Sequence, residues 1–178
     1  MGFASSMKRL FLAAWLALLA LACLPAHAAE NYLTASGEAA RAAGRVTEEL
    51  GRKPDVHTIR VTDKAVTMLV RGAKPSDVDE WTVGQASRLL FFSSETVRGP
   101  SAKSAPAIVS DPAGGFFSLD EIALDKVSEI ASRAIAYAKI QDAAQVQSIE
   151  IARRVSLLPT PAYGDIRFWI LGAAIAGL

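Results

Sequence analysis

Histidine and cysteine, the side chains most often used as general bases, nucleophiles and metal ligands, are scarce in this chain. The sequence holds two histidines, His27 and His57, and one cysteine, Cys23. His57 could act as a general base near neutral pH, but a catalytic triad also needs a positioned nucleophile and an orienting group. One histidine and no cysteine after residue 28 leave only oxygen ligands for a metal. We therefore predict neither a catalytic histidine nor a zinc site.

Acidic residues form two loose groups that could offer oxygen ligands to calcium. The groups are Asp111, Asp120, Glu121 and Asp125, and Asp77, Asp79 and Glu80. Neither has the spacing of a calcium-binding loop, and turn or helix-cap duty accounts for these acids without a metal. Paired carboxylates could also hydrolyse glycosidic bonds, but nothing in the sequence selects a pair. We expect no metal, no cofactor and no catalytic residue.

Large aromatic side chains supply much of the apolar surface, and most of them should join helices to strands in the core. They are Trp81, Phe91, Phe92, Phe116, Phe117, Phe168 and Trp169. Phe91 and Phe92 are adjacent in an expected strand, so they point to opposite faces and one of them is available to a partner. These two residues are the candidate binding residues.

The N-terminus has the order of a secretion signal. Lys8 and Arg9 precede an apolar run over residues 10–24, which is followed by Pro25 and a small-residue end at Ala28. A membrane anchor needs about 20 apolar residues, and this run is shorter. Lipidation of Cys23 is an alternative, although the preceding residues fit that motif poorly. We predict a signal peptide over residues 1–28, cleavage after Ala28 or next to it, and a periplasmic or secreted protein without stable membrane insertion.

Removal of residues 1–28 changes what the rest of the chain can do. It leaves 17 basic and 18 acidic residues, so the charge is nearly balanced and no nucleic-acid partner is implied. It also removes the only cysteine, so no disulfide is expected. About 150 residues remain, which is enough for one domain or two small ones.

The first half reads as a helix followed by two β-hairpins. Residues 39–50 have helical periodicity, with Thr34 or Ser36 as the cap and Gly51 as the stop. Residues 56–63 and 64–72 alternate in polarity, and His57 should share a face with Ile59 and Val61. Residues 80–86 and 89–97 form the second expected hairpin. We assign residues 30–97 to a first helix-plus-sheet unit.

A Gly, Pro and Ser-rich segment over residues 98–115 reads as a linker between two units. Beyond it, Ser118 and Glu121 have the spacing of a capping box, and an apolar stripe from Leu124 to Ala138 predicts a helix. Residues 146–154 and 165–171 are strand-like. Residues 116–178 are therefore assigned to a second helix-plus-sheet unit.

The two units contain matching strands. Residues 56–61, VHTIRV, match residues 146–151, VQSIEI, at an offset of 90 positions. Such self-similarity is typical of duplicated architecture, although the pattern V-x-x-I-x-V is also common in unrelated strands. In a duplicated chain the counterpart of strand 89–97 would fall beyond Leu178, which makes the second unit incomplete. The predicted fold class is α+β, with two helix-plus-antiparallel-sheet units in tandem behind a signal peptide.

This arrangement resembles the exported PepSY-like and β-lactamase-inhibitor-like α/β modules. The resemblance rests on the architecture over residues 34–178 and on the paired V-x-[ST]-I-x-[VI] strands, and it carries over no site residue. It implies a non-enzymatic inhibitor, chaperone-like binder or assembly accessory. We expect a non-catalytic binding or accessory protein of the bacterial envelope whose partner is another envelope or extracellular protein. An envelope hydrolase using paired carboxylates and a self-assembling surface protein are the alternatives.

Overall fold

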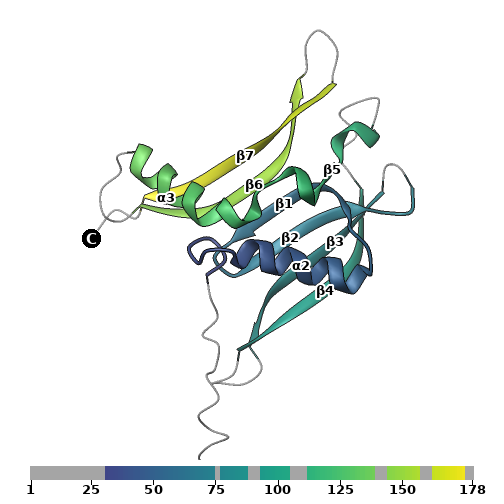
Figure 1. Ribbon diagram of the computed structural model, residues 1–178, viewed down its shortest axis with the longest axis horizontal. Coiled ribbons are helices and arrows are strands. Elements are labelled where there is room, and N and C mark those ends of the chain that lie inside the picture. Colours follow the sequence, from purple (N-terminus) through teal and green to yellow (C-terminus); the bar gives the residue numbers. More distant parts are fainter. Residues whose placement is uncertain are drawn as a thin grey trace, which may run out of the picture.

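A single antiparallel sheet organises the fold. The computed structural model describes residues 31–74, 77–87, 93–104, 112–138, 144–156 and 162–174. In chain order the helices and strands are α2 (Glu38–Leu50), β1 (Asp55–Thr62), β2 (Ala65–Arg71), β3 (Asp77–Ser87), β4 (Ser93–Ser104), β5 (Phe117–Ser118), α3 (Val127–Ala138), β6 (Ala144–Ser156) and β7 (Ala162–Ala174). The strand order is β4-β3-β2-β1-β6-β7, and the short β5 pairs with the start of β1 (Figure 1). The fold is α+β, as predicted.

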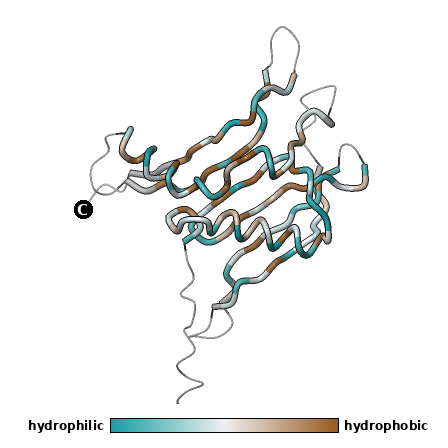
Figure 2. Tube along the Cα trace, in the orientation of Figure 1, coloured by the Kyte–Doolittle hydropathy of each residue, from teal (hydrophilic) through white to brown (hydrophobic). Residues whose placement is uncertain are grey.

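Both helices pack on the same face of the sheet and share one hydrophobic core (Figures 1 and 2). Fully buried strand residues at its centre are Ile59, Val61, Val66, Met68, Ile149 and Ile151. Ala42 and Val46 of α2 and Val127 and Ala131 of α3 belong to the same cluster. Each large aliphatic side chain contributes about 1.5–3 kcal/mol when it leaves water. The two expected units therefore share one sheet and one core, because β1 and β6 are direct neighbours.

A β-bulge changes the expected face pattern of β1. The pairing with β2 shifts between Val56 and Thr58, while Ile59 and Val61 keep regular partners in Met68 and Val66. Ile59 and Val61 enter the core cluster and His57 does not. The prediction that His57 shares their face is therefore wrong, because the extra residue of a bulge shifts the alternation by one position.

The first part of the expected linker is strand. Residues 98–104 belong to β4, where Arg98 pairs with Thr82 and Ser101 with Glu80 on either side of a bulge. Only one side of an edge strand has to pair, so it tolerates Gly, Pro and Ser that a central strand would reject. In residues 98–104 the Gly, Pro and Ser-rich composition therefore belongs to an edge strand and not to a linker. Residues 105–111 lie outside the described part of the chain, and η1 (Pro112–Gly115), a short 3₁₀ turn, follows them.

The helix boundaries agree with the sequence patterns better at the end of α2 than at its start. Gly51 ends α2 in the left-handed conformation, with its N–H bonded to the Glu48 carbonyl, as predicted. At the start the cap is Gly37, without a side-chain bond, and neither Thr34 nor Ser36 takes that role. The amide oxygen of Asn31 instead accepts bonds from the Leu33 and Thr34 N–H groups, which turns the chain before the helix.

The predicted capping box of Ser118 and Glu121 is present, but it begins a 3₁₀ turn, η2 (Leu119–Glu121). The extended backbone of Ile122 interrupts the helix, and a second turn, η3 (Leu124–Lys126), leads into α3 at Val127. The α-helix therefore starts later than its apolar stripe indicates, and Leu124 is buried from the turn before it.

A polar cluster, the Glu95 cluster, ties edge strand β4 to α2. Glu95 accepts hydrogen bonds from the Tyr32 hydroxyl at 2.6 Å, from two Arg41 nitrogens at 2.7 and 2.8 Å, and from Arg45 at 2.7 Å. The Arg41 bonds lower the pKa of Glu95 against the opposing effect of burial. Burial and the bond to Glu95 raise the pKa of Tyr32, and the bond to Glu95 is the main cause of the raised pKa of Arg41.

Candidate binding surface

The face of the sheet opposite the helices carries a shallow depression that spans β1, β2, β3 and β6. The depression measures about 430 Å³. Its lining residues are Thr58, Arg60, Thr67, Leu69, Glu80, Thr82 and Glu150, which we name the open sheet face. Alternation along each strand produces this surface: Val66, Met68 and Val70 of β2 are buried, whereas Thr67 and Leu69 between them are partly exposed.

An ion pair between the two central strands lies within the open sheet face. Arg60 of β1 is directly opposite Glu150 of β6, and their side chains meet at 2.8 Å. Arg60 is also opposite Thr67 of β2, which lies 3.3 Å from Thr82 of β3 through their hydroxyls. Because the side chains of Arg60 and Glu150 are 60% and 37% exposed, water screens the pair, and both remain available to a partner.

Two carboxylates line this depression, which the sequence did not select as a pair. Glu150 is neutralised by Arg60, and Glu80 lies 3.8 Å from the Lys103 ammonium. A general acid at neutral pH needs a carboxyl kept protonated by burial or by a like charge. Glu80 and Glu150 are each paired with a cation and partly exposed to water, so neither is buried in the way that this role needs.

His57 is buried near the start of β1, close to where β5 pairs with that strand. Its ring packs edge-on against Phe116 and Tyr163, with centroid distances of 5.6 and 6.2 Å. Burial lowers the pKa of His57, so the imidazole is held neutral. Its Nδ1 lies 2.9 Å from the Thr58 hydroxyl, and its buried Nε2 has no partner among the described residues. These contacts are those of a side chain with a packing role beside the sheet.

Three of the acidic residues considered for calcium, Glu80, Asp120 and Glu121, form ion pairs, and Glu121 also caps a turn. Asp120 pairs with Lys53 at 2.7 Å, and Glu121 completes the capping box and contacts Arg153 at 3.1 Å. Asp79 lies opposite Val70, and Glu80 lines the open sheet face. Asp111 is outside the described residues. Across the ranges that the structure describes, no group of three or more His, Cys, Asp or Glu side chains is placed to hold a metal.

Of the seven aromatic residues considered in the sequence, some are buried, one is well exposed and two lie outside the described residues. Phe91 and Phe92, the candidate binding residues, lie outside the described residues, as does the predicted cleavage site at Ala28. Trp81, Phe116 and Phe117 are buried, as expected. Trp169 is 53% exposed on β7, so it is not one of the aromatic residues that form the core. Its position opposite the exposed Glu150 puts it on the helix-free face, and this pairing partner is not readable from local sequence.

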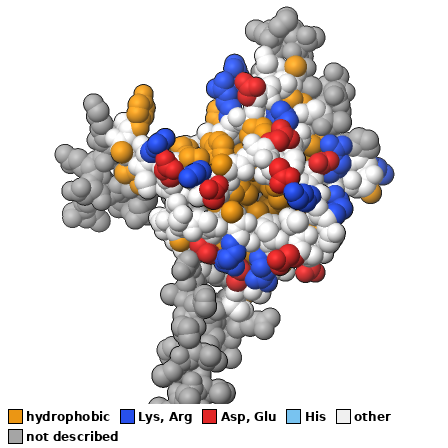
Figure 3. All heavy atoms as spheres, viewed as in Figure 1, with side chains coloured by type: hydrophobic (Ala, Val, Ile, Leu, Met, Phe, Trp, Pro, Cys, Tyr) orange, Lys and Arg blue, Asp and Glu red, His pale blue; other side chains and the backbone are white. Residues whose placement is uncertain are grey.

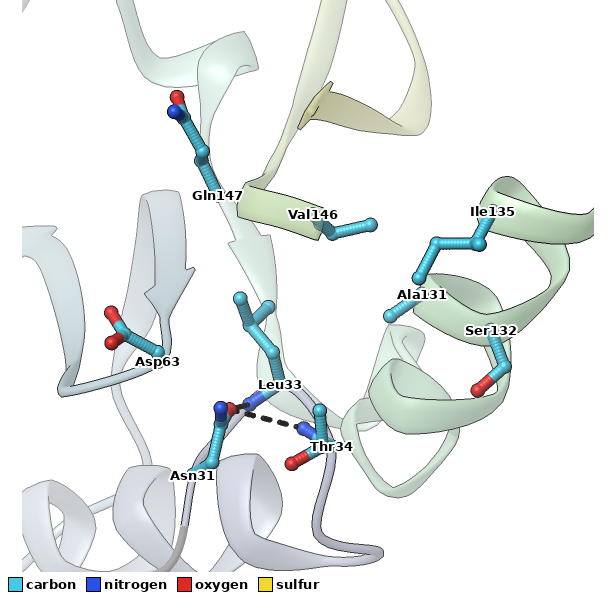
Figure 4. A pocket seen from close by; sticks show the side chains of 9 residues that line it. All are labelled: Asn31, Leu33, Thr34, Asp63, Ala131, Ser132, Ile135, Val146 and Gln147. Carbon is cyan, nitrogen blue, oxygen red and sulfur yellow. Dashed lines mark hydrogen bonds between the residues drawn. The ribbon is translucent and has the colours of Figure 1, made fainter. Parts of the chain in front are cut away.

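A second concave region lies on the helix-bearing face, beside α3. In Figure 3 hydrophobic side chains gather near the middle of this face with charged side chains around them. The groove measures about 420 Å³ and is lined by Asn31, Leu33, Thr34, Asp63, Ala131, Ser132, Ile135, Val146 and Gln147. Ala131, Ile135 and Val146 form an apolar wall, while Asn31 and Asp63 make the opposite side polar (Figure 4).

Comparison of the chain with models of protein families, with curated proteins and with solved structures gave no match. In the part of the chain that the structure describes, every helix is too short or too polar to span a membrane.

Proposed function

We propose that this chain is an exported, non-catalytic binding protein of the bacterial envelope, and that the open sheet face is its contact surface. The observation that carries the proposal is the central face of a seven-stranded sheet, which none of the described helices covers. It is lined by short hydroxyl side chains, Leu69 and a solvent-accessible Arg–Glu pair. A broad, shallow surface of this kind suits a protein partner, because small-molecule sites are usually enclosed and mostly apolar.

Export is the second part of the proposal. The basic, apolar and small-residue order of residues 1–28 supports a cleaved signal. The balanced charge of the remaining residues favours another envelope or extracellular protein over nucleic acid as the partner.

We further infer that the chain arose by duplication of one helix-plus-sheet unit. The sequence match relates residues 56–61 of β1 to residues 146–151 of β6, and Arg60 pairs with Glu150 at that same offset of 90 positions. Ile59 pairs with Ile151 and Val61 with Ile149. A two-fold rotation about an axis through the Arg60–Glu150 pair would therefore place β1 on β6 and β6 on β1. Each strand follows a helix packed on the same face. Two copies related by a two-fold rotation would produce this register.

A carboxylate hydrolase is the second candidate, because Glu80 and Glu150 line one depression. Both residues form ion pairs with cations, which argues against one of them acting as a general acid and the other as a base. Substitution E150Q with E80Q would abolish hydrolysis of envelope glycans if this candidate were correct.

The binding proposal is tested by capture with the mature protein as bait and with two variants. Thr67→Glu adds bulk and charge to the open sheet face, and Arg60 opposite it can pair with the new carboxylate, so the fold should persist. The control Glu49→Lys lies near the C-terminal end of α2 on the other face, where a cation suits the helix dipole.

We expect one envelope protein to be retained by the wild type and by Glu49→Lys, and its affinity for Thr67→Glu to fall at least about tenfold, a loss of about 1.4 kcal/mol. Circular dichroism should show the same fold for all three proteins. Equal capture by Thr67→Glu, or hydrolase activity lost in the E80Q/E150Q variant, would contradict the binding proposal.

A further inference from the structure

Exposed large hydrophobic side chains are concentrated at one end of the molecule. Among the described residues they are Ile135, Tyr137, Trp169, Ile170 and Leu171, from the C-terminal half of α3 and from β7. The three β7 residues are consecutive, and their exposed fractions are 53%, 42% and 60%. Consecutive strand residues point to alternate faces, so both faces of this edge are apolar.

The two edges of the sheet differ in how they are protected. Edge strand β4 carries Arg98, Pro100 and Lys103, which discourage the addition of another strand. At the opposite edge, residues 166–171 of β7 read IRFWIL and contain one charge, Arg167. Their pairing with β6 is regular, so this stretch presents a row of main-chain groups with no strand beyond it among the described residues.

The other half of the molecule shows what covers the equivalent position. Met68 of β2 is opposite Ile59, as Ile170 of β7 is opposite Ile149. Met68 is fully buried, and its outer neighbour is Trp81 of β3. Ile170 also has an isoleucine opposite it on the inner strand, but it is 42% exposed. An added antiparallel strand would bury it in the way that β3 buries Met68.

We propose that a second copy of this chain supplies that strand, with β7 pairing antiparallel to β7 of the partner about a two-fold axis at Phe168. This register places Phe168 opposite its own copy and Ile166 opposite the second copy's Ile170, which extends the apolar side of the sheet. On the helix-free face it places Arg167 opposite the second copy's Trp169, twice by symmetry. An Arg guanidinium over an indole ring is a favourable cation–π pair.

Charge selects this register over its neighbours. An axis at Arg167 would put two guanidinium groups opposite each other, which is destabilising. An axis at Trp169 would place Arg167 opposite Leu171, where the cation has no aromatic or acidic partner. The axis at Phe168 gives every residue from Ile166 to Ile170 a partner on the same face, as an isologous contact requires.

The experiment uses sedimentation of the mature chain over a range of concentrations, with two matched substitutions of the exposed Trp169. Trp169→Lys faces the second copy's Arg167 with a like charge, so we expect dimerisation to weaken at least about tenfold, a loss of about 1.4 kcal/mol. Trp169→Glu faces the same arginine with an opposite charge, so the dimer should persist.

Within one chain the same substitutions act in the opposite direction. Residue 169 is opposite Glu150, so lysine favours the folded monomer and glutamate disfavours it. Loss of the dimer in Trp169→Lys alone, with a circular dichroism spectrum and thermal midpoint like those of the wild type, therefore reports the contact between the two copies. A wild-type chain that sediments as a monomer at all concentrations, or equal loss of the dimer in both variants, would overturn the proposal.

Discussion

At the scale of single residues, burial and pairing decide which polar groups matter to this fold. Nothing in the sequence distinguishes Glu95 from other polar strand residues. In the fold it accepts hydrogen bonds from one tyrosine and two arginines. In the sequence, His57 was the residue best suited to act as a general base. Burial keeps it neutral and away from solvent, so its role is packing.

Glu95→Gln should lower the free energy of unfolding by about 2 kcal/mol at pH 7, because the arginines lose a charged acceptor. The folded-state pKa of Glu95 lies below its ordinary value of 4.5, so its contribution is complete above that value and is lost as pH falls through the folded-state pKa. Urea unfolding of both proteins at several pH values measures this, with the exposed Glu49→Gln as control. A stability difference that stays constant down to pH 2 would contradict it.

His57 should make stability fall as the solution is acidified below pH 6.5. Burial lowers its folded-state pKa, so between that value and 6.5 the unfolded chain takes up a proton that the folded chain refuses. His57→Gln should remove this pH dependence. Once His27 has left with the predicted signal, one imidazole remains, and its proton NMR titration gives the pKa directly. A midpoint at or above 6.5 would be inconsistent with a buried neutral ring.

At the scale of elements, strand positions near the edges of the sheet were the hardest to predict. Alternation located β1, β2 and β6, which are buried on one face, although a bulge near the start of β1 breaks its pattern. Composition placed the start of the predicted linker inside β4, because an edge strand pairs through its main chain and needs little apolar content. The capping box was recognised correctly, but local spacing did not distinguish a 3₁₀ turn from the first turn of α3.

Two glycine substitutions should have opposite effects because of the elements that hold them. Gly99 of β4 has φ +144°, and an added Cβ would lie 2.8 Å from both the Glu80 carbonyl oxygen and the Trp81 ring. Gly99→Ala should therefore destabilise the fold by about 2 kcal/mol or more. Gly44 lies inside α2 with open space around it, so Gly44→Ala should stabilise by about 0.5–1 kcal/mol. Thermal unfolding compares them, and stabilisation by Gly99→Ala would refute the close approach of β4 to Trp81.

At the scale of the whole molecule, the two predicted units are joined through their central strands. The core cluster includes Val46, Ile59 and Met68 from the first half and Val127, Ile149 and Ile151 from the second. Removing either half would expose these residues and leave one long side of β1 or β6 unpaired. The shared core and the pairing of β1 with β6 therefore predict that the two halves unfold together and not as independent domains.

Unfolding should accordingly be a single transition seen alike from both halves. Trp81 and Trp169 are the two tryptophans beyond the predicted signal, and they lie in β3 and β7. Fluorescence of the variants Trp169→Phe and Trp81→Phe therefore reports each half separately. Adding Ile151→Ala should shift both signals by the same amount, about 3 kcal/mol. Movement of only the Trp169 signal would indicate two independently folding units.

The sequence by itself determined the α+β class, the positions of most strands and helices, the stop of α2 and the scarcity of catalytic groups, because these depend on local periodicity, turn residues and composition. Only the tertiary structure decided that β1 lies beside β6, that a bulge turns His57 away from the core, and that Trp169 is exposed at an edge. Strands pair through main-chain hydrogen bonds that are the same for every sequence. The choice of neighbour and register therefore depends on packing across the whole molecule.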